Sequence, residues 1–101
     1  MFYVSHKFGG DPAEYEKAAK ITRLLQIADP DNCYICPLMA FSHIQYGQLG
    51  YDVEMALCLE LLSKCEGLIV ASEISEGVRR EITYAAEHDI PIEFLNKREG
   101  V

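Results

Sequence analysis

The apolar stretch GLIVAS at residues 67–72 constrains the fold of this chain more than any other part of the sequence. It contains no alternation of apolar and polar side chains, so it predicts a short strand that is buried on both faces. Strands of this kind run through the middle of parallel sheets, where helices cover both sides. The stretch therefore predicts an α/β protein with residues 67–72 as a central strand.

The rest of the chain alternates between strand-like and helical patterns. Strands are predicted at 2–6, 33–37, 67–72 and 90–95, and helices at 12–28, 52–65 and 76–88, with a helical turn allowed within 38–50. Right-handed crossovers then favour a four-stranded parallel sheet of order 2-1-3-4 with helices on both faces. We expect a single three-layer α/β domain of the Rossmann or flavodoxin type over residues 1–101, with 95–101 as a loose C-terminal tail.

The two predicted helices at 12–28 and 52–65 carry further signals. Asp11, Pro12 and Glu14 form a strong helix start, in which Asp11 caps and Glu14 can reach back to complete a capping box. The helix at 52–65 has two apolar stripes, which consist of Met55, Cys58, Leu62 and Cys65 on one side and Leu57 and Leu61 on another. Such a helix is either deeply buried or faces a partner, and in so small a domain we expect a homo-oligomer, a dimer or larger, formed through it.

Composition and charge exclude several kinds of partner. The chain of 101 residues has 9 basic and 16 acidic groups, and the resulting charge of −7 repels DNA and RNA. A small phosphorylated ligand is still allowed, because one pocket can be locally positive. No apolar run is long enough to cross a bilayer, and the N-terminus MFYVSHKFGG does not resemble a signal peptide. We therefore expect a cytoplasmic protein without a membrane partner.

The four cysteines, Cys33, Cys36, Cys58 and Cys65, include one CxxC spacing, which raises the alternative of a zinc site. However, residues three apart in a strand point to opposite faces, and Cys58 and Cys65 lie in a leucine-rich helix. We expect buried, reduced thiols, and neither a metal nor a cofactor.

The predicted strand order places the topological switch point between the first and third strands. Ligands of open parallel sheets bind at the carboxyl ends of the strands that flank this point, which here are followed by the loops 7–11 and 72–77. In the first loop, glycines allow close approach of a ligand and the flanking side chains offer polar contacts, which gives the candidates His6, Lys7, Gly9, Gly10 and Asp11. The alternative is an ordinary tight turn with a capping aspartate.

The second loop leads into the helix that carries Glu81. Ser75 can cap this helix and offer its hydroxyl to a ligand, and the backbone N–H groups after it, near Gly77, form an anion site at a helix N-terminus. Glu81 falls at the boundary of the apolar face, where a partly buried carboxylate facing a crevice is a candidate nucleophile or base. The alternatives are an ordinary cap and a solvated or ion-paired glutamate.

Across nearly its whole length the chain resembles the nucleoside 2-deoxyribosyltransferase superfamily, and most of all its small phage- and bacteria-associated branch. The most specific similarity is a Ser-x-Gly segment followed by a glutamate, then an alanine and a Pro-Ile pair, which here are Ser75, Gly77, Glu81, Ala85 and Pro91–Ile92. SHKFGG, residues 5–10, resembles the family's first loop, which implies that Ser5 and its neighbours hold the sugar and 5′ end of the ligand.

The resemblance implies that Glu81 attacks the anomeric carbon of a deoxynucleoside or its 5′-monophosphate, forming a covalent glycosyl-enzyme that water or another base resolves. The sequence departs from the family at Cys58, where active members carry an aspartate, and Asp52, Glu54 and Glu60 are the nearby carboxylates that could replace it. His43 and Tyr46 are the candidates for contacting the base. A non-catalytic nucleotide-binding module and a plain oligomeric interaction domain are the alternatives.

Overall fold

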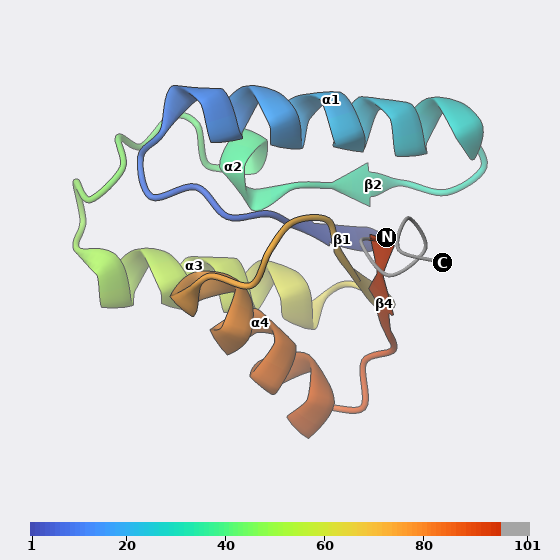
Figure 1. Cartoon of the computed structure of the whole chain (residues 1–101). Coiled ribbons are helices and arrows are strands. Elements are labelled where there is room, and N and C mark those ends of the chain that lie inside the picture. The colour runs from blue at the N-terminus through green and yellow to red at the C-terminus, as the bar shows by residue number, and fades with distance from the viewer. Residues whose placement is uncertain (96–101) are drawn as a thin grey trace.

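The computed structural model describes residues 1–95 and has the predicted α/β architecture (Figure 1). Its elements are β1 (Phe2–Ser5), α1 (Pro12–Ala28), β2 (Tyr34–Ile35), α2 (Pro37–Ala40), α3 (Tyr51–Ser63), β3 (Gly67–Val70), α4 (Glu76–Glu87) and β4 (Ile92–Phe94). The four strands are all parallel, in the order β2-β1-β3-β4. This confirms the predicted sheet order, with β1 and β3 paired at its centre.

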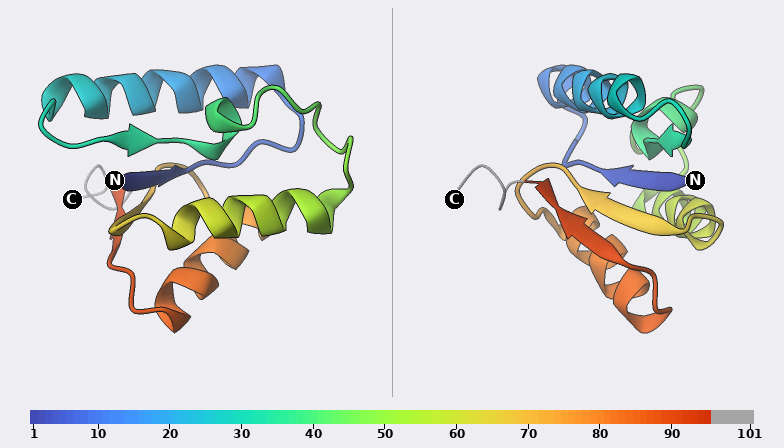
Figure 2. Two further views of the ribbon diagram at one scale, coloured as in Figure 1. Left: turned by 180° about the vertical axis from the view of Figure 1, so that it is seen from behind. Right: turned by 90° about the vertical axis from the view of Figure 1, so that its right-hand side faces the viewer.

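The sheet is covered on both faces, with α1 and α2 on one side and α3 and α4 on the other (Figure 2). Because successive strand residues point to opposite faces, Tyr3 joins a core with α3 and α4, whereas Val4 joins a second core with α1. All four residues of β3 are buried, as expected from the apolar run that forms it. Leu95 packs against the core under α1, and the rest of the predicted tail lies outside the described residues.

The region around Pro37 differs from the predicted strand at 33–37. Strand β2 has only two residues, and Pro37 opens the short helix α2 instead of ending a strand. The reason is that proline has no N–H for a sheet ladder but suits the first position of a helix, where that N–H has no partner. The helical turn allowed within 38–50 is thus real and begins one residue earlier.

The start of α1 is capped as predicted, except for the role of Glu14. The Asp11 side chain accepts a hydrogen bond of 2.9 Å from the Ala13 N–H, and Pro12 occupies the first helical position. Glu14 does not complete a capping box. Its side chain is buried and turns to Lys17, whose ammonium lies 3.1 Å from Oε1. The Asp11 N–H, which a capping box would direct to Glu14, donates instead to the carbonyl oxygen of Phe8 at 3.1 Å.

The two apolar stripes predicted for the helix at 52–65, now α3, are each at least partly buried by other residues of the same chain. Met55 and Leu62 are buried, and Leu61 packs against the core that contains Leu62. Leu57 is half-buried and lines the cavity described below. The second stripe therefore has neighbours in its own chain, and an oligomer formed through this helix stays a prediction. Within residues 1–95 no helix combines the length and apolar character needed to span a membrane.

Candidate functional site

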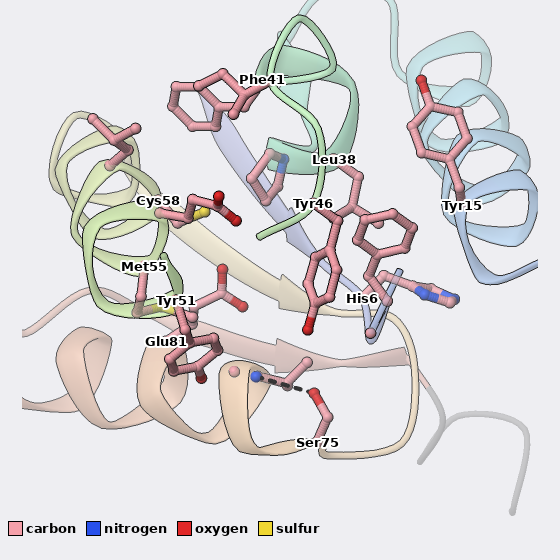
Figure 3. A pocket seen from close by; sticks show the side chains of 18 of the residues that line it. His6, Tyr15, Leu38, Phe41, Tyr46, Tyr51, Met55, Cys58, Ser75 and Glu81 are labelled. Atoms are coloured by element: carbon pink, nitrogen blue, oxygen red, sulfur yellow. Dashed lines mark hydrogen bonds between the residues drawn. The ribbon is translucent and has the colours of Figure 1, made fainter. Parts of the chain in front are cut away.

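A cavity of about 460 Å³ opens at the carboxyl ends of β1 and β3, where the predicted switch point lies (Figure 3). These strands end side by side, with Ser5 opposite Val70 in the register. The walls come from the loop after β1, the start of α1, helix α2 and the segment that follows it, helix α3 and the first two turns of α4. A cavity of this size suits a small organic molecule.

Glu81 lies deeper than predicted, since only 5% of its surface is exposed. It reaches the cavity wall from α4, and its carboxylate is held by two side chains of β1. The Tyr3 hydroxyl donates a hydrogen bond to Oε2, and the Ser5 hydroxyl donates one of 2.6 Å to Oε1. Each oxygen therefore has a donor, which fixes the orientation of the carboxylate and reduces the cost of burying its charge.

The surroundings of Glu81 shift several proton affinities in the same direction. Burial raises the pKa of the Glu81 carboxyl, and the hydrogen bonds from Ser5 and Tyr3 oppose this shift. Burial and the neighbouring carboxylate raise the pKa of the Tyr3 phenol well above its usual range. The same two causes raise the pKa of the Cys58 thiol to about 11. At neutral pH both groups thus remain protonated and able to donate hydrogen bonds.

Some of the candidate residues in and beside the first loop line the cavity, and others do not. His6 and Gly9 line the cavity, and Ser5 lies fully buried behind Glu81. Lys7 does not line it, because its ammonium forms an ion pair with Glu73. Two further candidates, which also do not line the cavity, have structural roles: Gly10 packs against Tyr46 and Asp11 caps α1.

The second loop places Ser75 and Gly77 on the cavity wall. The Ser75 hydroxyl accepts a hydrogen bond of 3.3 Å from the Val78 N–H, so Ser75 is the predicted cap of α4 (Figure 3). Gly77 allows α3 to approach α4 closely, since a Cβ atom there would lie 3.2 Å from Cε of Met55. Both residues therefore shape the wall by their backbone as well as facing the cavity.

Aromatic side chains make up much of the remaining lining, and sequence analysis anticipated only Tyr46 among them. The five are Phe8, Tyr15, Phe41, Tyr46 and Tyr51. Tyr3 was also missed as a partner of Glu81. The signal for Tyr3 was available: it lies two residues before Ser5 in a strand, so both face the same helix layer. The aromatic residues lie in loops and at helix ends, where no periodicity reveals which way a side chain points.

Three carboxylates near Cys58 could replace the aspartate that active members of the resembled superfamily carry, and they differ in whether they reach the cavity. Glu54 lines the cavity, but Oε1 accepts from the Gly47 N–H at 3.0 Å and Oε2 from the Leu49 N–H at 2.9 Å. Asp52 is exposed and lies 3.4 Å from Arg80, and Glu60 is exposed. Glu54 is thus the one of the three that reaches the cavity, where it anchors the backbone of a wall segment.

Within residues 1–95, no three His, Cys, Asp or Glu side chains are grouped so that they could hold a metal ion. Cys36 and Cys65 are buried, Cys58 is half-buried and Cys33 is exposed, and all four are free thiols. No family model, curated protein or solved structure matches the chain. The chemistry of the cavity therefore has to be argued from its own residues.

Proposed function

We propose that the protein cleaves or transfers the N-glycosidic bond of a 2-deoxynucleoside or its 5′-monophosphate, with Glu81 as nucleophile. The proposal takes up the resemblance to the nucleoside 2-deoxyribosyltransferases. The observation that carries it is the Glu81 carboxylate, which is buried at the wall of the switch-point cavity and held by Tyr3 and Ser5. A buried, oriented carboxylate beside a ligand-sized cavity is what this chemistry requires.

The reaction proceeds by two displacements at the anomeric carbon. An oxygen of Glu81 bonds to this carbon while the bond from the carbon to the base nitrogen breaks, and the electron pair leaves with the base, which takes up a proton. Water, which loses a proton, or a second base then attacks the same carbon and frees the carboxylate, so the configuration is retained. Tyr3 and Ser5 hold the attacking group in place, which lowers the entropy cost of reaching the transition state.

The test is release of free base from a panel of nucleosides and nucleotides, followed by chromatography. We expect turnover by the wild type and a fall of at least about 1,000-fold in Glu81→Ala, as for removal of other nucleophiles. Glu87→Ala is the matched control, since Glu87 lies on the same helix but is exposed. Base release at background level, or release that Glu81→Ala leaves unchanged, would refute the proposal.

Cys58 favours a second candidate, a module that binds nucleotides without reacting with them. With a pKa of about 11, the Cys58 thiol supplies no negative charge at neutral pH in the place of the family's aspartate. In that case nucleotides raise the melting temperature equally in the wild type and Glu81→Gln, and neither protein turns them over. Turnover gained by Cys58→Asp would support this second candidate, and no thermal shift with any nucleoside or nucleotide would contradict both.

A further inference from the structure

We propose that Tyr46 is the side chain that recognises the base, and that position 10 is a glycine because Tyr46 lies against it. The inference rests on the proposed function and deepens it. It names the base-binding residue of the cavity and a second residue, far away in the sequence, that positions it.

Tyr46 belongs to the segment 41–50, which crosses from α2 to α3 above the carboxyl end of the sheet. Its ring lines the cavity, yet 57% of the residue's surface is exposed, and it belongs to neither hydrophobic core. Figure 3 shows its hydroxyl end directed toward the side of the cavity where Ser75 and Glu81 lie. A large ring with so much free surface has area left for a ligand to cover.

The first loop holds the Tyr46 ring in this position. The Phe8 ring meets it edge-on, with centroids 5.3 Å apart and an interplanar angle of 77°. Gly10 lies against the ring so closely that a Cβ atom at position 10 would be 2.9 Å from Cδ1 and 3.3 Å from Cε1. Any side chain there would push the ring out of place.

The backbone that follows Tyr46 is held independently by α3. Both oxygens of Glu54 accept hydrogen bonds from this backbone, one from Gly47 and one from Leu49. Phe8 and Gly10 therefore contact the ring itself, and Glu54 holds the backbone just after it, before any ligand arrives. An aromatic side chain that is pre-positioned in this way loses little entropy on binding, and stacking on a planar base suits its free surface.

The experiment titrates adenine, thymine and 2-deoxyribose into the protein by calorimetry. We expect Tyr46→Ala to weaken binding of both bases by about fivefold or more and to leave deoxyribose binding unchanged. Gly10→Ala should act like Tyr46→Ala, and Tyr46→Phe should bind like the wild type. Gly50→Ala is the control for backbone strain, since φ is +89° there and +79° at Gly10, but no atom lies within 4 Å of its Cβ.

Equal base affinity in the wild type and Tyr46→Ala would overturn the inference. So would the absence of base binding by the wild type. A loss of deoxyribose binding in Tyr46→Ala as large as its loss of base binding would overturn it as well. Turnover measured alongside separates this inference from the proposed function. Equal kcat/KM for deoxynucleosides in the wild type and Tyr46→Ala overturns only the role of Tyr46. Base binding that depends on Tyr46 without any turnover supports that role and overturns only the enzymatic proposal.

Discussion

The Glu81 carboxyl is buried and hydrogen-bonded by Tyr3 and Ser5, so its ionisation affects the stability of the fold. Burial raises its pKa above the ordinary value of 4.5, and the donors Tyr3 and Ser5 only partly offset this. The folded protein therefore binds a proton at this position more tightly than the unfolded chain does. The stability that this group contributes is fully present below the ordinary carboxyl pKa and is lost as the pH rises through the raised value. At neutral pH the buried charge thus costs stability.

Glu81→Gln is expected to make the protein more stable at about pH 8, by roughly 1 kcal/mol or more, because it removes a buried charge and keeps an oxygen that Tyr3 or Ser5 can donate to. The gain should shrink toward about pH 4, where the wild-type carboxyl is protonated. Urea unfolding at both pH values measures the difference, with the exposed Glu87→Gln as control. A gain of equal size at both pH values, or a loss at the higher one, would contradict this assignment of the charge.

At the scale of secondary structure, the order of the sheet could be predicted because the signals were local and strong. The apolar run of β3 fixed a central strand, and the Asp11–Pro12 start of α1 fixed where the first crossover begins. The edge strand β2 was less predictable, because Pro37 could either end a strand or begin a helix and sequence alone did not decide.

The candidate site could be located from the sequence, but the direction of its side chains could not. The switch point follows from strand order, and both predicted loops contribute residues to the cavity wall. Lys7 was expected to contact a ligand. Instead its ammonium forms an ion pair with the Glu73 carboxylate, and neither residue lines the cavity. Glu81 appeared to be at the core boundary, since a helical wheel does not show that the Tyr3 and Ser5 hydroxyls provide a polar site inside.

Asp11 gives a prediction about the helix that it begins. Asp11→Ala is expected to lower stability by about 1 kcal/mol, because the Ala13 N–H loses its acceptor. Under the proposed function, it should leave kcat/KM for deoxynucleosides unchanged, since Asp11 does not line the cavity. Asp11→Asn keeps a capping oxygen and is the matched control. Chemical denaturation and steady-state kinetics measure the two effects, and a large fall in kcat/KM without a change in stability would instead place Asp11 on the ligand.

The charged side chains of the cavity are acidic, and the molecule as a whole is also negatively charged. The chain carries a charge of −7, and the cavity lining includes Glu54, Glu76 and Glu81. Among residues 1–95, no lysine or arginine lines the cavity, and the N-terminus of α4 with Ser75 is the feature that favours an anion. The electrostatic field of the molecule therefore opposes a doubly charged phosphate more than a neutral sugar hydroxyl.

Under the proposed function, this field predicts which form of the substrate is preferred. A 2-deoxynucleoside should have a higher kcat/KM than its 5′-monophosphate, by roughly tenfold at low salt, as expected for about 1.4 kcal/mol of electrostatic repulsion. The difference should narrow in about 0.5 M salt, because screening weakens the repulsion of the phosphate and leaves the neutral substrate unaffected. Glu76→Gln should narrow it in the same direction, since Glu76 lies beside the α4 N-terminus. Steady-state kinetics on the nucleoside and its monophosphate at several salt concentrations measures both effects.

A preference for the monophosphate that weakens as salt is added would contradict this prediction. It would mean that the α4 N-terminus outweighs the acidic lining and binds the phosphate directly.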